Sequence, residues 1–339
     1  MRNKFVVRSF LIIVILLVGG SLYSLPYYVS KPGKAMELSP IIEVENGYEE
    51  KGSFMLTTVR MGKANIYSYL LAKLNKYEEI YPVEVIRSED ETDEEYNVRQ
   101  LHLMASSKLA AIEVAYEAAG IPVNYQYRGV YVLNVIPGMP AEDKLQAGDR
   151  VFKVDGKEFK SSTEFVSYVE NLGDGQEIAL TFERNQVVKE VTIPLKEFED
   201  RPGKVGVGIG LVDDKEIIVD PVVEVETEKI GGPSAGTMFA LEIYNQLTVD
   251  DYTKGYEIAG TGTIDPEGNV GPIGGIEQKI IAADKAGAEI FFAPNEGGAA
   301  DSNYRAASAT AKDIGTNMKI VPIDTFSEAI AYLQSLRAK

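Results

Sequence analysis

The sequence predicts an α+β protein of more than one domain, preceded by an apolar helix. The chain has 339 residues, 45% of them hydrophobic, which is enough for about two packed cores at roughly 150 residues each. A long uncharged segment lies near the amino terminus. The remainder alternates between strand-like and helix-like segments joined by glycine-rich junctions, which is typical of mixed folds.

Composition excludes several classes of function. Acidic residues outnumber basic ones 51 to 34, and the net charge of −17 would repel a phosphate backbone, so we expect no nucleic-acid partner. There is no cysteine, which excludes disulfides and thiolate metal sites, and the single histidine, His102, excludes an HExxH zinc site. We expect no metal and no organic cofactor. His102 lies between two leucines of a predicted helix, where we expect it to pack or face solvent.

The amino terminus is predicted to be a membrane anchor. Residues 9–30 carry no charge, and 22 residues of helix would rise about 33 Å, close to the hydrocarbon thickness of a bilayer. Arg2, Lys4 and Arg8 precede this segment and favour a cytoplasmic amino end. We therefore assign residues 1–31 to a cytoplasmic terminus and one transmembrane helix, with the later domains outside the cell. A cleaved signal peptide is the alternative, but no clear cleavage site follows.

Residues 32–125 are predicted to be a β/α region. Residues 32–40 contain two prolines and a glycine and indicate a short tether. Strands are expected at 41–45 and 53–60, and helices at 64–76 and 94–119.

Residues 126–198 are predicted to form a smaller β-rich domain with two helices. Strands are expected at 129–136 and 147–156, helices at 140–145 and 162–172, and a hairpin at 177–183 and 187–194. The segment "PGMPAEDKLQAGDRVFKVDGKEF" resembles bacterial PDZ domains. The resemblance implies capture of an extended peptide at a strand edge, with its carboxylate held by loop N–H groups. That loop would contain Arg128, Gly129 and Val130. The alternative is a packing module without a ligand.

Residues 199–339 are predicted to form an α/β domain with two glycine-rich junctions. "GGPSAG" opens a helix expected at 234–246, and "GPIGG" precedes one expected at 276–286. Strands are expected at 215–226, 256–264, 290–293 and 318–323, and helices at 304–314 and 326–337. A nucleotide site is not indicated, because there is no GxxxxGK[ST] and no helix follows the glycines of 206–210.

Ser234 and Lys279 are the candidate catalytic residues. Ser234 lies at a helix amino end, where free N–H groups could stabilise the negative charge on a carbonyl attacked by its hydroxyl. Lys279 follows 45 residues later, one turn into the next predicted helix, and could remove the hydroxyl proton. Such a base must be neutral. Lowering a lysine pKa from about 10.4 to about 7 costs roughly 4 to 5 kcal/mol, which requires a dry apolar pocket that the neighbouring isoleucines could supply.

The two junctions also carry a family resemblance. "GGPSAG" followed by "AGTGTIDPEGNVGPIGGIEQKIIAA" resembles the proteolytic domain of Lon proteases. The resemblance implies that Ser234 and Lys279 form a Ser-Lys dyad and that Thr261 hydrogen-bonds the amine. Gly231 departs from the aspartate of many Lon enzymes. The chain contains no ATPase motif, so we expect activity without ATP.

Together the three parts resemble membrane-anchored Lon-like PDZ proteases of Gram-positive bacteria. This resemblance predicts an extracytoplasmic, ATP-independent serine endopeptidase that cleaves exported peptides or flexible protein segments, and a ring-forming homo-oligomer is compatible with it. Residues 41–59 could belong to the protease domain, which would make the PDZ domain an insertion. The alternative function is a membrane-tethered PDZ adaptor whose Lon-like half is a silent scaffold.

Overall fold

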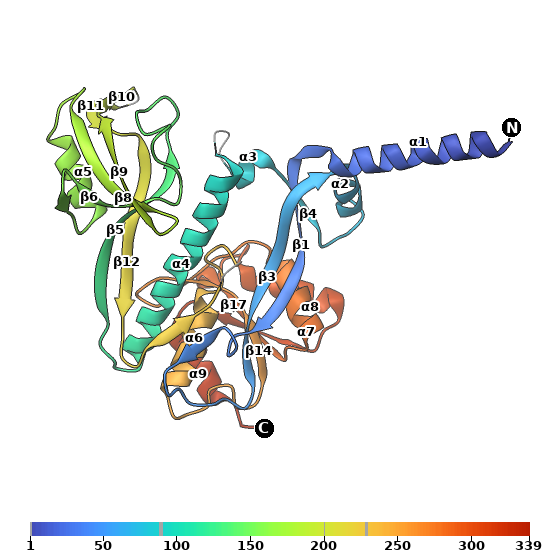
Figure 1. Ribbon diagram of the computed structural model, residues 1–339. Helices are drawn as coiled ribbons and strands as arrows, with labels where there is room; N and C mark the ends of the chain where they lie inside the picture. Colours follow the sequence, from blue (N-terminus) through green and yellow to red (C-terminus); the bar gives the residue numbers. More distant parts are fainter. Residues whose placement is uncertain (1, 88–90, 200, 228–229) are drawn as a thin grey trace.

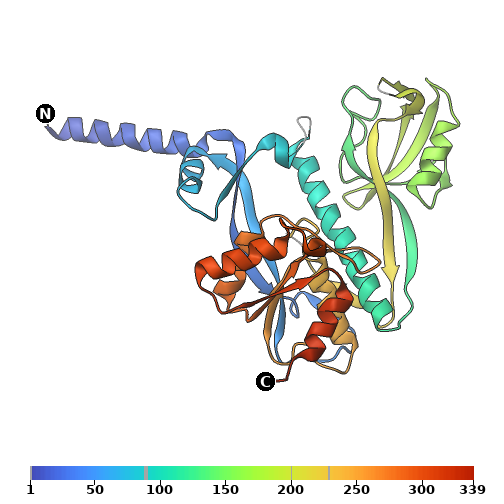
Figure 2. The same ribbon diagram turned by 180° about the vertical axis from the view of Figure 1, so that it is seen from behind.

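The computed structural model describes residues 2–87, 91–199, 201–227 and 230–339. A long amino-terminal helix projects from a body built around one sheet, and a second sheet stands beside that body (Figure 1). Helix α4 (Asp93–Ala118) lies between the body and the second sheet in both views (Figures 1 and 2). The fold is therefore α+β, as predicted.

The body contains a six-stranded sheet with the order β18-β17-β14-β3-β1-β4. Neighbours among β3, β14, β17 and β18 are parallel, whereas β1 is antiparallel to β3 and β4. The strands are Ser24–Glu37 (β1), Ser53–Asn65 (β3), Glu79–Pro82 (β4), Glu257–Gly260 (β14), Ile290–Pro294 (β17) and Lys319–Ile323 (β18). Segments from both ends of the chain thus build one sheet.

Helices cover this sheet on both faces. Because successive strand residues point to opposite faces, Phe54 and Leu56 of β3 enter one core and Met55 enters the other. The first core is shared with α4, α6 (Gly236–Leu247) and α9 (Phe326–Ser335), and the second with α7 (Ile276–Ala286) and α8 (Asn303–Ile314). This layering holds the starts of α6 and α7 against β3 and β14.

The second sheet has the order β12-β5-β6-β8-β9, with β7 beside β6. Its strands are Asn124–Val135 (β5), Arg150–Val154 (β6), Lys157–Glu158 (β7), Glu177–Arg184 (β8), Val187–Pro194 (β9) and Ile209–Ile218 (β12), and helix α5 (Ser162–Glu170) packs in its core. The predicted hairpin is confirmed, with Asn185 and Gln186 at positive φ in its two-residue turn. The predicted helix at 140–145 is wrong. Only a turn forms there, in which the Lys144 and Leu145 N–H groups both donate to the Ala141 carbonyl.

Short elements complete the chain. Three small ladders pair Ile42–Val44 (β2) with Val223–Val225 (β13), Lys196–Phe198 (β10) with Arg201–Gly206 (β11), and Thr263–Ile264 (β15) with Val270–Gly271 (β16). Helices α2 and α3 span Ile66–Ala72 and Val83–Ile86, and a 3₁₀ turn spans Glu296–Gly298. The predicted strand at 215–226 is divided into β12 and β13 around Pro221, which has no N–H to donate to a ladder.

The amino-terminal prediction is corrected in part. Helix α1 (Arg2–Leu22) ends well before residue 30, and β1 begins at Ser24, so neither a helix through Ser30 nor a tether at 32–40 forms. The reason is burial, since Val29 and Ser30 are enclosed in the main sheet. Among the described residues, no helix combines the length and apolar character needed to span a bilayer. The predicted anchor also includes positions 9, 12, 13, 15 and 16, whose side chains lie outside the described residues. The predicted location stays a prediction.

A fully buried carboxyl group, Glu242 of α6, lies beside a half-buried one, Glu50 of the segment before β3. Glu242 is fully buried and accepts a hydrogen bond from Gln246 Nε2 at 2.6 Å, while Glu50 accepts one from Asn245 Nδ2 at 3.1 Å. Burial, with the neighbouring Glu242 and Asp251 charges, raises the pKa of Glu50 from 4.5 to about 9, and burial raises that of Glu242 to about 7. The folded state therefore retains protons that the unfolded chain releases.

This pair makes stability depend on pH. Between pH about 5 and about 7 these two carboxyl groups bind more protons in the folded chain than in the unfolded one, so their contribution to the free energy of unfolding falls as pH rises. We expect the melting temperature to decrease across this range, and Glu242→Gln to flatten the decrease while the exposed control Glu267→Gln does not. Calorimetry at fixed ionic strength measures the melting temperature of each variant at each pH. Parallel pH profiles for wild type and Glu242→Gln would contradict the assignment.

Candidate active site

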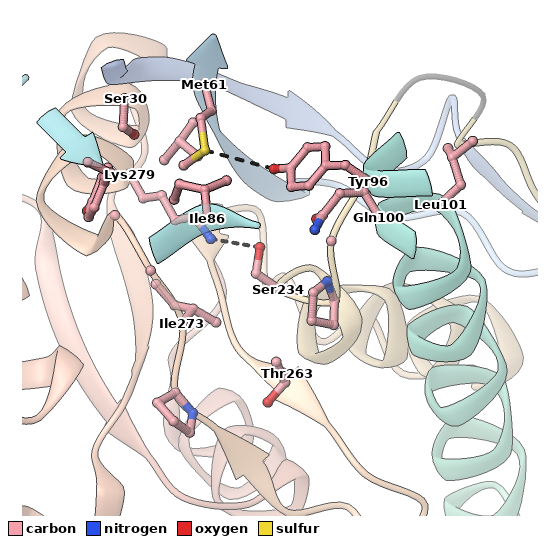
Figure 3. A pocket seen from close by; sticks show the side chains of 18 of the residues that line it. Ser30, Met61, Ile86, Tyr96, Gln100, Leu101, Ser234, Thr263, Ile273 and Lys279 are labelled. Carbon is pink, nitrogen blue, oxygen red and sulfur yellow. Dashed lines mark hydrogen bonds between the residues drawn. The ribbon is translucent and has the colours of Figure 1, made fainter. Parts of the chain in front are cut away.

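Ser234 lies in the loop immediately before helix α6, and Lys279 lies in the first turn of α7. The Lys279 Nζ donates a hydrogen bond to Ser234 Oγ at 2.8 Å (Figure 3). The two residues are 45 positions apart, and the shared packing of α6 and α7 against the main sheet brings them together. The structure thus joins the two predicted catalytic side chains directly.

Thr261 completes this arrangement. It follows β14 and is fully buried. Its hydroxyl donates to the Ser234 carbonyl at 2.9 Å and accepts from Lys279 Nζ at 2.9 Å. Because the hydroxyl proton is engaged with the carbonyl, an oxygen lone pair faces the amine. The predicted contact between Thr261 and the amine is present, and it orients Nζ toward Ser234.

The environment of Lys279 favours a neutral amine. The residue is 2% exposed, and burial lowers its pKa from 10.5 to about 7. Ile276 and Ile280 of the same helix belong to the apolar core on that face of the sheet. No carboxylate forms an ion pair with this amine among the described residues. Near neutral pH a large fraction of Lys279 can accept a proton.

An open cleft of about 830 Å³ leads to the dyad. Figure 3 shows side chains from several elements around it, with Tyr96 and Gln100 of α4 on one side and Ile273 from the segment before α7 on another. The Tyr96 hydroxyl lies 3.9 Å from Met61 Sδ, so α4 and β3 meet across the cleft. A smaller recess of about 290 Å³ adjoins Ser234 and Lys279, and its apolar lining is Met36, Leu56, Val59, Met104, Ile230 and Ala235. No local pattern in the sequence predicts the residues that form these walls.

Strand β3 presents a free edge at this cleft. Strand β14 pairs with β3 only from Ser53 to Leu56, whereas β1 follows the opposite edge along most of its length. Val59 and Met61, beyond the end of β14, line the cleft. No other strand pairs with that edge in the part of the chain that the structure describes. Its free backbone groups can accept an extended peptide as an added strand.

Gly231, which departs from the aspartate common in Lon enzymes, faces helix α4. A Cβ at this position would lie 2.9 Å from the Cβ of Gln100. Any side chain would therefore force α4 away from the loop that carries Ser234. The close approach of α4 explains the glycine.

The structure does not place the predicted peptide-binding residues of the smaller domain in a loop. Arg128, Gly129 and Val130 lie within β5, not in a loop, and β5 pairs with β12 on one side and β6 on the other. Val130 is paired on both sides, with Asp213 of β12 and with Val151 of β6, so no peptide can add a strand at that position. Strand β12, which comes late in the domain sequence, forms the edge of this sheet.

A cleft of about 240 Å³ lies between this edge and helix α5. Its apolar lining is Ile136, Phe165, Val166, Val169, Phe198, Val205, Val207, Ile209 and Leu211. Lys204 and Arg201 also line it, and Lys204 forms a 2.7 Å ion pair with Glu170. An edge strand beside an apolar cleft with cations at its rim suits an extended peptide.

His102 takes no part in either cleft. Its ring stacks on Tyr131 of β5 with centroids 6.1 Å apart, and its Nε2 lies 3.3 Å from Ser106 Oγ. Burial lowers its pKa. The residue thus packs between α4 and the second sheet, as predicted.

Comparison with known proteins agrees with this geometry. A family model described as the Lon protease (S16) C-terminal proteolytic domain matches residues 162–335, and a PDZ domain model matches residues 118–195. The chain is 35% identical over 132 residues to a Lon protease of Campylobacter jejuni, which is 35% of this chain and 16% of that protein. It is 34% identical over 148 residues to a Lon protease of Flavobacterium johnsoniae, which is 43% of this chain and 18% of that protein. The chain thus spans less than a fifth of these relatives.

Solved structures of PDZ domains are also similar to part of the chain. The PDZ domain of an SdrC-like protein from Listeria monocytogenes is 36% identical and covers 26% of this chain and 90% of that one, with a TM-score of 0.25. The corresponding domain from Listeria innocua is 34% identical and covers 24% and 92%, with a TM-score of 0.23. Since the Lon model matches just over half of the chain, the chain belongs to the family of the Lon protease (S16) C-terminal proteolytic domain, a serine peptidase family, and carries a PDZ domain beside it.

Proposed function

We propose that the protein is an ATP-independent serine endopeptidase with Ser234 as nucleophile and Lys279 as general base. The 2.8 Å contact between Lys279 Nζ and Ser234 Oγ carries this proposal, together with the burial that favours the neutral amine. Thr261 holds Nζ in line with the hydroxyl. We further propose the location predicted from the amino-terminal sequence, so that the substrates are exported peptides or flexible segments of proteins.

The reaction follows from these positions. Ser234 Oγ attacks the peptide carbonyl carbon while its proton passes to Lys279 Nζ, and the carbonyl oxygen gains the negative charge. The C–N bond then breaks, and the protonated Lys279 gives its proton to the leaving amine. Water attacks the acyl-enzyme, again giving a proton to Lys279, and the proton returns to Ser234 as the acid product leaves. The base is neutral again at the end of each cycle.

An extended substrate fits the shape of the site. The free edge of β3 offers backbone pairing along the cleft, and the apolar recess beside the dyad suits an apolar side chain next to the cut bond. A compact fold cannot present its backbone to such an edge. The enzyme therefore acts on segments that are already unfolded.

The test of the proposed function compares an unfolded with a folded substrate. We expect purified full-length protein in mild detergent to cleave casein and to leave a stable folded protein of similar size intact. Mass spectrometry of the products identifies the cut sites. Equal digestion of both substrates would contradict the requirement for an extended chain, and casein cleavage that persists in Ser234→Ala would overturn the catalytic assignment.

We also propose that the β12 edge and α5 bind the carboxyl terminus of a peptide with apolar last residues. Val166 is 39% exposed in this cleft, and a carboxylate there would meet both the apolar lining and Glu170 one helical turn later. We expect Val166→Glu to weaken binding of such a peptide at least about tenfold. Fluorescence anisotropy with a labelled peptide measures the affinity of wild type and variant.

Val187→Glu is the matched control. Val187 is 55% exposed on β9, at the opposite edge of the same sheet, so its replacement should leave affinity unchanged. The same peptide with an amidated carboxyl end separates carboxylate recognition from simple apolar contact. Undiminished binding to Val166→Glu would remove this cleft as the peptide site.

A further inference from the structure

Ser107 of helix α4 contacts the loop that carries the nucleophile. It is 4% exposed, and its hydroxyl donates a hydrogen bond to the Pro233 carbonyl at 3.0 Å. A Cβ at Gly236 would lie 2.5 Å from Ser107 Oγ, so only glycine allows α6 to begin this close to α4. Ser107 is absent from the lining of the catalytic cleft. It touches the loop and not the substrate.

This hydrogen bond fixes the orientation of one peptide plane. The Pro233 carbonyl and the Ser234 N–H belong to the same trans peptide, in which the two groups point in opposite directions. With the carbonyl held toward α4, the Ser234 N–H points away from α4. That N–H makes no hydrogen bond to another described residue. It is a free donor beside the Ser234 hydroxyl.

Helix α4 holds the same loop at a second point. The Gly232 N–H donates to the Gln100 carbonyl at 2.9 Å, seven residues before Ser107 on α4. The Gly231–Gly232 peptide and the Pro233–Ser234 peptide are therefore both held by one helix. Without these two hydrogen bonds, the loop with its two glycines could adopt several peptide orientations.

We propose that Ser107 is a positioning residue for the oxyanion hole, an inference that rests on the proposed peptidase function. By holding the Pro233 carbonyl, Ser107 directs the Ser234 N–H to the place where the substrate carbonyl oxygen becomes negative during attack. No bond to Ser107 forms or breaks in the reaction. Ser107 keeps the Ser234 N–H oriented before the negative charge develops on the substrate oxygen. This orientation lowers the activation barrier of the chemical step without making the substrate bind more tightly.

Ser107→Ala tests the proposal. Removing one direct oxyanion donor costs about 10²–10³ in kcat, and Ser107 acts through such a donor, so we expect kcat to fall about tenfold or more. KM should change less than twofold. The affinity for a peptide boronate, which forms a tetrahedral adduct with the serine, should fall by the same factor as kcat/KM. Ser106→Ala, an exposed neighbour on α4, should leave all three values unchanged.

The outcomes separate this proposal from the proposed function. Wild-type cleavage that is lost in Ser234→Ala while Ser107→Ala retains full kcat would overturn the role of Ser107 alone. A loss in Ser107→Ala that appears only in KM, or that leaves boronate affinity unchanged, would overturn it as well. Should the wild type cleave nothing, crystal structures decide: a Pro233 carbonyl in the same orientation in wild type and Ser107→Ala would refute the positioning role, and a reoriented one would support it.

Discussion

Lys279→Met is expected to lower kcat about 10³-fold or more at neutral pH, because general-base catalysis typically contributes 10²–10⁴ and the side chain also positions Ser234. Methionine has a similar length and is apolar, so it suits a site that is 2% exposed. The substitution removes the proton acceptor without leaving a buried charge. Steady-state kinetics on a quenched fluorescent peptide, with melting temperature as a check on folding, measure the effect.

The pH dependence of the wild type provides a second measure of the same residue. Since burial lowers the pKa of Lys279 to about 7, the amine is protonated and cannot act as a base below that pH. We expect kcat/KM to rise with pH through about 7 and then to level off. Lys285→Met, an exposed position on the same helix, is the control and should retain both the rate and this profile. A Lys279→Met variant with wild-type activity would exclude the lysine as base.

Ser234→Ala is expected to reduce cleavage by a factor on the order of 10⁴ or more, since a nucleophile and its base act as a unit. The variant keeps the fold because the substitution removes only the side-chain oxygen of Ser234, just before α6. It should also fail to form the covalent adduct with a peptide boronate, which intact-mass spectrometry detects. The double variant Ser234→Ala/Lys279→Met should be no slower than Ser234→Ala alone. Additive losses would show that the two residues do not share one step.

The dyad could be predicted from the sequence because its residues lie in two short glycine-rich motifs. Each motif predicts its own turn and helix start, and family resemblance supplies their pairing. The hydrogen bond from Ser107 to Pro233 could not be predicted in this way. It joins residues 126 positions apart, and no local pattern marks Ser107 among the small residues of its helix.

Two other features were mispredicted for identifiable physical reasons. Residues 24–30 lack charge and belong to β1, which is buried at residues 28–30 between β3 and β4, and a buried strand and a membrane segment share that composition. The resemblance predicts a carboxylate-binding loop at Arg128, Gly129 and Val130, which the structure places inside β5. Which strand forms a sheet edge depends on the order of strands in space, and β12, the last strand in sequence, takes that place.

The ribbon formed by β5 and β12 bears on how such a chain can arise. Asn124 and Ile218, its first and last residues, are direct partners in the ladder. Neighbouring strands lie about 5 Å apart, so the whole segment 124–218 leaves and rejoins the catalytic body across one strand spacing. Because the two ends of this segment are held side by side, the segment constrains the catalytic body as a tight turn would. The number of residues beyond the ribbon adds no further entropic cost of loop closure to the body. A gene segment of this kind can be gained, lost or exchanged without altering the path of the catalytic core.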